Sequence, residues 1–393
     1  MSHQLINHSA DLKLLVDEGY AVGIENGHLI IDEIPYVDAL RRVRRGTFIC
    51  PLDANSHNTV PPQTHVMYFS GEYPCNPQGM PLEILGKTSP PIRRLGARAV
   101  QHAFSNKPKG PQGPRPYRDF YEKVTTYTDI LLSAAVAIDA AATAKVGALP
   151  SIPDDAPFTI PDSGSARSGT TDLADVFRQE VISLVGLGGT GSYILDHLCK
   201  TPFRECRLFD GDRFYPHNAF RAPGAPMRAE LQPPPFKVDY YVSKYSHLKN
   251  GLQPHPVAID ANNLHLVEGS TFAFVSMDAC PAKALLINKL EDLGVSFIEV
   301  GMGLHKTPHG IGGTLRAVLS TPQNRDEARR HIPLEIGGKD RVYTNNIQLS
   351  DLNSMNANFA IQMWKAYRGF YLNFAENIWT YQLDTRTLIR EAA

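Results

Sequence analysis

The sequence of 393 residues is poor in cysteine and has no pair of cysteines at zinc-binding spacing. Its five cysteines, an odd number, stand at positions 50, 75, 199, 206 and 280. The missing CxxC pairs argue against a zinc ribbon, and the odd count argues against a disulfide framework. Free thiols are typical of a reducing compartment, so we expect a cytoplasmic protein without zinc.

Long hydrophobic runs and an excess of charge of one sign are also missing. The N-terminus lacks the basic and then apolar pattern of a secretion signal. The longest apolar stretch, 130–146, is interrupted by Asp139 and is too short and alanine-rich to span a bilayer. Lys and Arg number 39 against 40 Asp and Glu, a formal charge of −1. No global field therefore favours nucleic acid or a membrane, and we expect neither as a partner.

The chain length predicts two or three domains. We place an N-terminal α+β accessory domain at 1–148, a linker rich in Pro, Ser and Gly at 149–170, and a second domain at 171–393. The linker composition predicts a flexible or extended connection. In the first domain we expect a helix capped by Ser9, a hairpin turn at Asn26-Gly27 and a long helix over 121–145. The arginine-rich stretch 40–45 lacks aromatic residues, and we interpret it as a solvated helix face.

Apolar runs alternate with helical patterns in the second domain. This alternation predicts an α/β fold, a doubly wound and mostly parallel Rossmann-like sheet. The predicted strands are 181–185, 206–209, 272–277, 296–301 and 314–320, and the predicted helices are 192–200, 281–293 and 351–371. Ser350 is the expected cap of the last helix.

A glycine turn, Gly186, Gly188, Gly189 and Gly191, joins the first of these strands to its helix. Such a turn brings backbone N–H groups and a helix N-terminus against phosphate. Alone it does not separate one class of nucleotide enzyme from another. A GxxxxGK[ST] loop is missing, which excludes P-loop chemistry.

Polar residues follow the predicted strand ends in an order that a dehydrogenase does not need. They are Asp210, Asp212, Asn218, Arg221, Lys237 and, after a separate strand, Asp278. Arg221 and Lys237 fit the neutralisation of charge on a triphosphate, and Asp278 fits a magnesium or leaving-group role. These positions lie where ligands bind in a doubly wound sheet.

The segments GLGGTGS and DGDRFYPHNAFR together resemble the ThiF/MoeB-type adenylyltransferases, the superfamily of the ubiquitin-activating enzymes. The resemblance covers about residues 171–372. It implies catalytic roles for Arg221, Lys237 and Asp278, with Mg²⁺ at Asp278 and ribose hydroxyls at Asp210. The implied ATP-binding residues are Gly186, Gly188, Gly189, Gly191, Asp210, Asp212, Asn218, Arg221 and Lys237.

Departures from the family pattern concern the acceptor of the acyl group above all. Thioester-forming members carry a cysteine in the crossover connection, here 321–346, which has none. Cys75 and Cys280 remain as candidate acceptors, although a turn thiol and a small residue packing near the nucleotide explain them more simply. Lys283 stands where the family has Arg, and a proline-rich insert lengthens the spacing before Lys237.

Three further segments resemble a narrower group of bacterial proteins found beside ubiquitin-like modifiers: 346–371, THVMYFSGEYPC and FSNKP…FYEKVTTY. The resemblances imply ATP-dependent adenylation of the C-terminal glycine carboxylate of a ubiquitin-like protein, followed by acyl transfer to a nucleophile on this chain or a partner. They also imply a homodimer, and they leave open a ubiquitin-conjugating-enzyme-like protein as a second partner. The alternatives are an adenylyltransferase for a sulfur-carrier protein, an NAD-dependent oxidoreductase and a non-catalytic nucleotide-binding scaffold.

Overall fold

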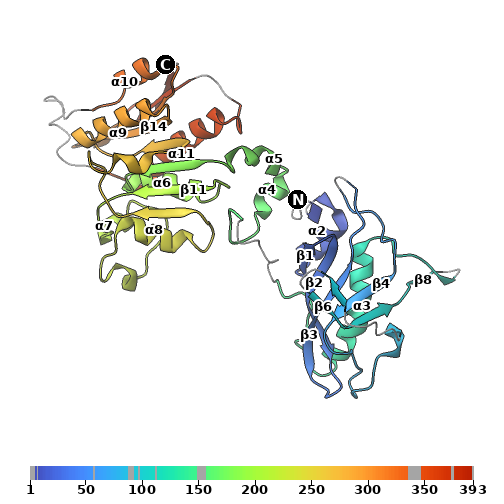
Figure 1. Cartoon of the computed structure of the whole chain (residues 1–393). Helices are drawn as coiled ribbons and strands as arrows, with labels where there is room; N and C mark the ends of the chain where they lie inside the picture. The colour runs from blue at the N-terminus through green and yellow to red at the C-terminus, as the bar shows by residue number, and fades with distance from the viewer. Residues whose placement is uncertain are drawn as a thin grey trace. The chain divides into compact units, whose positions relative to one another are not determined.

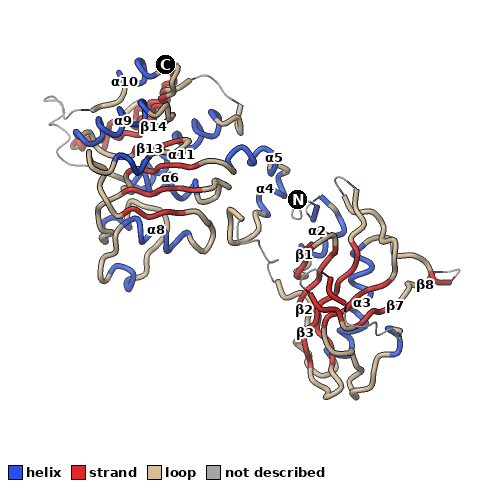
Figure 2. Tube along the Cα trace, viewed as in Figure 1, coloured by secondary structure: helices blue, strands red, loops and turns tan. Residues whose placement is uncertain are grey.

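The computed structural model describes residues 5–6, 8–55, 58–86, 93–95, 98–110, 113–147, 156–334, 347–372 and 376–391. These residues divide into two compact units (Figures 1 and 2). One lies within Met1–Asp154 and Ile160–Thr171, and the other within Asp155–Thr159 and Asp172–Ala393. None of the helices in the described ranges has the length and apolar character that a membrane crossing requires.

The first unit is a five-stranded antiparallel sheet covered by the long helix α3. The strand order is β1-β2-β3-β4-β7. Rings of Phe48, Phe69, Phe104 and Tyr127 contact one another in its buried core. The elements are α2 (Ala10–Asp17), β1 (Ala21–Glu25), β2 (His28–Val37), β3 (Val43–Pro51), β4 (Val66–Ser70), η1 (Glu83–Leu85), β5 (Arg93–Leu95), β6 (Arg98–Val100), β7 (His102–Ser105), β8 (Lys109–Gly110), β9 (Gly113–Pro114), α3 (Phe120–Val136) and α4 (Ser163–Ser168).

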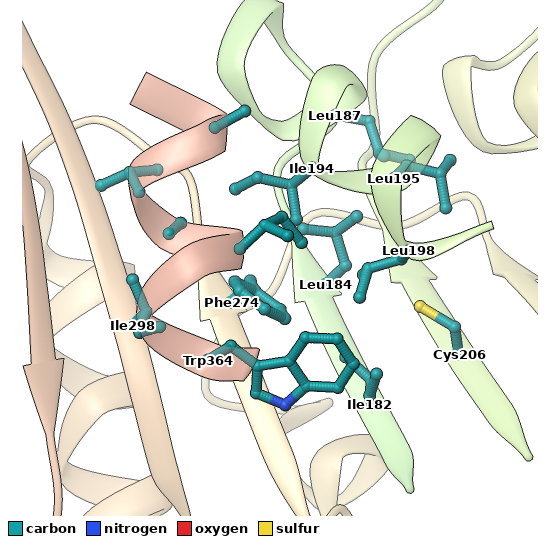
Figure 3. Packing of buried hydrophobic residues seen from close by; sticks show 14 of the residues in the cluster. Ile182, Leu184, Leu187, Ile194, Leu195, Leu198, Cys206, Phe274, Ile298 and Trp364 are labelled. Atoms are coloured by element: carbon teal, nitrogen blue, oxygen red, sulfur yellow. The ribbon is translucent and has the colours of Figure 1, made fainter. Parts of the chain in front are cut away.

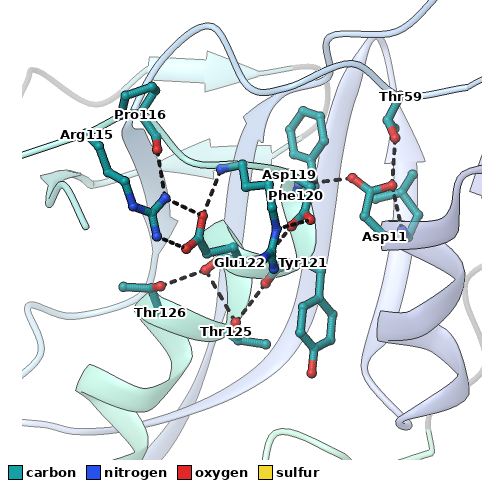
Figure 4. Close-up of polar contacts among 12 residues, drawn as sticks. Asp11, Thr59, Arg115, Pro116, Asp119, Phe120, Tyr121, Glu122, Thr125 and Thr126 are labelled. Atoms are coloured by element: carbon teal, nitrogen blue, oxygen red, sulfur yellow. Dashed lines mark hydrogen bonds and ion pairs between the residues drawn. The ribbon is translucent and has the colours of Figure 1, made fainter. Parts of the chain in front are cut away.

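Side-chain hydrogen bonds fix the start of α3 in this unit (Figure 4). The Asp119 carboxylate accepts the backbone N–H of Glu122 at 2.8 Å, which caps the helix. Asp11 of α2 accepts the backbone N–H of Phe120 at 3.0 Å and the hydroxyl of Thr59 at 2.6 Å. The two helices and the loop before β4 are therefore tied together by one carboxylate.

The hairpin prediction for this unit is confirmed, and two helix predictions are wrong. Asn26 and Gly27, with φ of 47° and 72°, form the two-residue turn between β1 and β2. The α3 helix ends at Val136 rather than at residue 145, because Asp139 accepts the N–H of Ala141 at 2.9 Å and turns the chain. The stretch 40–45 is a turn leading into β3, where Arg42 and Arg44 pair with buried Asp38.

The helix predicted after Ser9 is present, but Ser9 does not cap it with its side chain. Ser9 stands at the N-cap position of α2. Its hydroxyl accepts the backbone N–H of Thr59 at 2.9 Å instead. A similar correction applies to Ser350, which is the first residue of its helix and meets the hydroxyl of Tyr193.

The second unit is an eight-stranded sheet in the order β12-β11-β10-β13-β14-β15-β16-β17. Its first five strands are parallel and the last three antiparallel, as the doubly wound α/β prediction requires. The helices and strands are α5 (Thr171–Ala174), η2 (Asp175–Phe177), β10 (Val181–Val185), α6 (Gly189–Leu198), β11 (Glu205–Phe209), α7 (Pro216–Ala219), η3 (Arg228–Leu231), α8 (Lys237–Tyr245), β12 (Leu252–His255), η4 (Leu264–Val267), β13 (Phe272–Val275), α9 (Pro281–Asp292), β14 (Ser296–Thr307), β15 (Gly310–Ser320), α10 (Arg325–Arg330), α11 (Ser350–Tyr367), β16 (Ile378–Gln382) and β17 (Thr387–Glu391).

Successive residues of the central strands supply two hydrophobic cores, one on each face of the sheet. Phe272 and Phe274 of β13 belong to the core that contains Trp364 of α11, and Figure 3 shows this core. Ala273 and Val275 belong to the core under α9. Because side chains alternate along a strand and both faces are covered here, the four residues of β13 are all hydrophobic and all buried.

Part of the predicted linker packs against the second unit. Phe158 is 8% exposed and pairs with Lys249. Thr159 donates its N–H to the carbonyl of Leu248 at 3.0 Å. Residues 156–159 are thus an extension of this unit, while 149–155 lie outside the described residues; the domain boundaries stay a prediction.

Candidate nucleotide site

The glycine turn between β10 and α6 is tightly packed on one side and open on the other. A Cβ added to Gly191 would lie 1.9 Å from the carbonyl oxygen of Gly186, and one added to Gly186 would lie 2.1 Å from that of Ser276. Gly186 also has a φ of +91°, which favours glycine. At Gly188 no atom of the described residues comes within 4 Å of an added Cβ. The turn therefore presents backbone and a helix N-terminus to open space at Gly188, as a phosphate site requires.

Asp210, directly after β11, stabilises this turn through hydrogen bonds. Its carboxylate accepts the backbone N–H of Leu187 at 2.7 Å and that of Asp212 at 2.8 Å. The ammonium of Lys237 lies 3.3 Å from the same carboxylate. The three segments that the sequence separates by up to 50 residues thus meet at one acid.

Lys237 joins the two acids of the DGD segment. Its ammonium donates to Asp212 at 2.7 Å, and its backbone N–H donates to the carbonyl of Asp212 at 2.9 Å. The side chain of Lys237 is only 6% exposed, whereas that of Asp212 is 78% exposed. Because the ammonium of Lys237 is already buried and Asp212 is already in solvent, Lys237 can release Asp212 and bind a phosphate with little further desolvation.

Asn218 shapes the short helix that carries the chain to Arg221. It is buried, and its side-chain oxygen accepts the backbone N–H of Tyr215 at 2.8 Å. Its backbone carbonyl accepts the N–H of Arg221 at 3.1 Å. Asn218 therefore positions Arg221 through backbone geometry.

Arg221 carries a buried donor without a partner. Its Nε has no hydrogen-bond acceptor among the described residues. Burial raises the pKa of Tyr241, Asp210 raises it further, and the positive charge of Arg221 opposes this shift. The charges of Arg221 and Asp210 thus both act on this buried tyrosine. An anion at this place would satisfy the orphaned Nε, so the residues fit a nucleotide phosphate.

Asn353 of α11 completes the site, and we did not select it from the sequence. It is fully buried; its amide donates to the carbonyl of Arg221 at 3.0 Å, and its oxygen accepts the hydroxyl of Thr190 at 3.2 Å. A Cβ on Gly189 would lie 2.0 Å from the same amide. The only sequence signal was its place in the segment 346–371, which resembles a narrower protein group.

Asp278 lies at the same edge of the sheet, three residues beyond the end of β13. The strand β13 is the neighbour of β10. Ser276, directly after β13, donates its backbone N–H to the carbonyl of Val185 at the end of β10, at 2.8 Å. Asp278 is exposed. The described residues contain no group of three His, Cys, Asp or Glu that could hold a metal. One carboxylate with substrate phosphates is a usual environment for Mg²⁺, so Asp278 fits that ion.

Lys283, which departs from the family pattern, belongs to a buried ion pair. Its ammonium lies 2.5 Å from the carboxylate of Glu299, and Arg316 lies 3.2 Å from the other oxygen. Glu299 has no exposed side-chain surface. The pair joins α9, β14 and β15, and truncating one partner would leave a buried charge.

The two candidate acceptor cysteines differ in environment. Cys75 is 2% exposed, and burial raises the pKa of its thiol, to which Asp38 and Glu72 add. These are the properties of a structural thiol rather than of a nucleophile. Cys280 is partly exposed and stands at the N-cap position of α9, directly after the Asp278 loop.

Sequence comparison finds a family for the N-terminal part alone. Residues 10–163 match a family described as "Domain of unknown function (DUF6791)". No curated protein matches the chain. The match covers the first unit and gives it no chemistry.

Comparison with solved structures finds similarity over about half of the chain. MccB of E. coli, in a structure with ATP, matches with 15% identity and a TM-score of 0.42 over 56% of this chain and 65% of that one. The E. coli tRNA N6-threonylcarbamoyladenosine dehydratase TcdA matches with 15% identity and a TM-score of 0.40 over 53% of this chain and 93% of that one. The chain thus spans just under two thirds of MccB. These are distant similarities to proteins of the E1-like class.

Proposed function

We propose that the second unit binds MgATP and adenylates the C-terminal glycine carboxylate of a ubiquitin-like protein. The observation that carries the nucleotide part is the buried Nε of Arg221, which has no partner among the described residues, beside a glycine turn that is open at Gly188. The motif match in sequence supports the substrate class. The roles of the site residues follow from both.

In this proposal the carboxylate oxygen of the substrate attacks the α-phosphorus and pyrophosphate leaves. Lys237 and Arg221 bind phosphate oxygens and offset charge that develops in the transition state. Asp210 holds the turn through Leu187 and accepts ribose hydroxyls. Asp278 would hold Mg²⁺, which would supply positive charge to offset that of the pyrophosphate leaving group.

A nucleophile on this chain or on a partner, such as a ubiquitin-conjugating-enzyme-like protein, then attacks the acyl carbon of the adenylate; the acyl group is transferred and AMP leaves. We place the flexible tail of the substrate along Gly301 and Gly303 of β14. The guanidinium of Arg316 lies against Gly301, where an added Cβ would be 2.7 Å away. We also propose a homodimer, because the resemblance to the ThiF/MoeB-type adenylyltransferases implies one.

ATP–pyrophosphate exchange with candidate ubiquitin-like proteins tests the reaction. We expect exchange that requires a free C-terminal glycine and stops when that carboxylate is removed by amidation. Asp278→Ala should abolish exchange, and Arg221→Ala and Lys237→Ala should each lower it by about two orders of magnitude. Asp239→Ala, an exposed acid of α8, is the matched control and should retain full exchange.

Nucleotide specificity separates this proposal from its rivals. Binding of NAD in preference to ATP would indicate an oxidoreductase. Binding of ATP without exchange, whatever carboxylate is offered, would indicate a nucleotide-binding scaffold. Full exchange by a folded Asp278→Ala protein would remove the assignment of that residue.

A further inference from the structure

A cavity of about 800 Å³ lies in the second unit away from the glycine turn. It is bounded by the C-terminal ends of α6 and α11 and by β15, β16 and β17. Both helices begin at the nucleotide site, where Thr190 and Asn353 meet, and run away from it. The cavity-lining residues of α11 run from Asn358 to Ala366, about 7 to 20 Å beyond Asn353 along the axis, and none of them belongs to the nucleotide site. The cavity is therefore separate from the site already described, and its volume is in the range of small-molecule pockets.

Positive charge predominates on the cavity wall. Lys200, Lys365 and Arg390 line it, against the single carboxylate of Glu376. Lys200 pairs with Asp196, but Lys365 and Arg390 form no salt bridge with any described residue. The ammonium of Lys365 instead lies 5.2 Å from the ring centroid of Phe370. Burial lowers the pKa of Lys365, and among the described residues this half-buried cation has no anion that would offset its desolvation.

Three buried polar atoms of the wall lack hydrogen-bond partners among the described residues. They are Nε2 of His197, Oε2 of Glu376 and Nε1 of Trp379. The indole N–H is a donor only, and the carboxylate oxygen is an acceptor only. Buried groups of this kind are normally satisfied, so an occupant should offer both an acceptor and a donor. Apolar side chains, Leu319, Ile361 and Met363, supply the remaining contact.

His197 reports on the charge in the cavity. Burial lowers its pKa, and Lys200 and Lys365 lower it further, while Asp196 opposes them. An anion bound beside Lys365 would favour the protonated imidazole. The same ring is thus a probe of occupancy that does not depend on any catalysed reaction.

We propose that this cavity is a second ligand site, which binds a small organic anion with an apolar body and a hydroxyl or amino donor. The anionic group, a carboxylate or a phosphate, lies between Lys365, Arg390 and the indole N–H of Trp379. The donor group lies against Glu376. The site stands independently of the adenylation proposal, because it uses none of the same residues.

Ring spectra of the ¹⁵N-histidine-labelled full chain test this proposal, with His197→Gln to assign the signal. The probes are 4-hydroxyphenylacetate and 4-hydroxyphenyl phosphate, which share the phenol donor and distinguish carboxylate from phosphate. The neutral isostere is 4-hydroxyphenylacetamide. We expect at least one anion to raise the pKa of His197 by about one pH unit, and the amide to leave it unchanged. The effect should disappear in Lys365→Met and persist in Lys306→Met, an exposed lysine on the β14–β15 hairpin.

Several outcomes would overturn the proposal. One is that the pKa of His197 does not change with either anion at roughly 10 mM, about tenfold above a dissociation constant of 1 mM. Another is an equal response to the neutral amide, or a full response in Lys365→Met. A response of His197 to protein concentration but not to the anions would mean that a second copy of the chain fills the cavity.

Discussion

The ammonium of Lys249 donates a hydrogen bond to the backbone carbonyl of Pro157 at 2.9 Å. Its other two protons go to the carbonyls of Phe203 and Asn250, at 2.8 and 2.9 Å. The lysine is 1% exposed, and its ammonium lies 3.8 Å from the ring centroid of Phe203. One buried cation therefore holds residues 156–159, within the predicted linker, against the second unit.

Burial lowers the pKa of Lys249 from 10.5 to about 8, which makes the stability of this unit pH-dependent. Between pH 8 and 10.5 the unfolded chain binds more protons than the folded one, so the free energy of unfolding rises with pH. We expect a slope from this group of up to about 1.4 kcal/mol per pH unit. Urea titrations followed by tryptophan fluorescence measure it, since the two tryptophans, Trp364 and Trp379, both lie in this unit.

The difference between wild type and Lys249→Met isolates the effect. Tyr241 and Cys206 have pKa values raised by burial, so they lower the stability as pH rises, but they do so in both proteins. Lys249→Met should be less stable at pH 7.5, because three carbonyls lose their donor. The gap between the two proteins should widen from pH 8 to pH 10, and a constant gap would contradict the assigned titration. Lys306→Met should show no such change.

Two glycines of the turn should separate folding from nucleotide binding. Gly191→Ala places a methyl group 1.9 Å from a backbone oxygen, so we expect a loss of about 1–3 kcal/mol in unfolding free energy. Gly188→Ala meets no described atom within 4 Å and should change stability by less than about 0.5 kcal/mol. Its methyl group nevertheless points into the proposed phosphate space, so ATP affinity should fall at least tenfold. Thermal melts and ATP titrations measure the two quantities, and unchanged ATP affinity in folded Gly188→Ala would place the phosphates elsewhere.

Asn353 should act on the reaction by positioning rather than by contact with the substrate. Asn353→Ala removes the hydrogen bonds to the carbonyl of Arg221 and to the hydroxyl of Thr190, so Arg221 is no longer held in position relative to the glycine turn. We expect pyrophosphate exchange to fall about tenfold or more, mainly in kcat, with a smaller change in KM for ATP. Thr190→Ser keeps the hydroxyl and should retain most of the activity. Equal losses in both variants would indicate a general packing defect instead.

The sheet of the second unit could be predicted from the sequence because its central strands are short apolar runs that end at glycine or acidic residues. Val181–Val185 and Phe272–Val275 were placed to within two residues for this reason. The long β14–β15 hairpin was underestimated, since its outer half is polar and glycine-rich. The end of α3 was missed because the alanine-rich sequence after Val136 favours helix. In the structure Asp139 accepts the N–H of Ala141, and the chain turns there instead.

The candidate site was predictable only where a motif fixes the spacing. Residues from Gly186 to Lys237 lie close along the chain, and the β-α-β geometry brings them together. Asn353 lies 163 residues from Thr190 and reaches it through α11, so no local pattern could connect them. The cavity near Lys365 combines residues of the stretch 358–390 with His197, Lys200 and Leu319, which are distant from it in sequence, and its charges look like solvated surface in the sequence alone.

The last prediction concerns the acceptor of the acyl group, and it follows from the thiols. Cys75 is buried with a raised pKa, and Cys280 is only partly exposed. A thiolate is the nucleophile in thioester formation, and Cys75 is held as the thiol. A hydroxyl activated by a base accepts an acyl-adenylate as an oxyester, because the adenylate is a good electrophile.

We therefore expect the Cys75→Ala, Cys280→Ala double variant to transfer the modifier at a rate within about threefold of wild type, given ATP and the cognate ubiquitin-like protein. Intact mass spectrometry with and without dithiothreitol and hydroxylamine distinguishes the linkages. An adduct that resists dithiothreitol but is cleaved by hydroxylamine indicates an oxyester. If wild type forms an adduct that dithiothreitol removes, and the double variant forms none, then a cysteine is the acceptor. The single variants would then decide between the partly exposed thiol beside Asp278 and a Cys75 that must first leave its buried position.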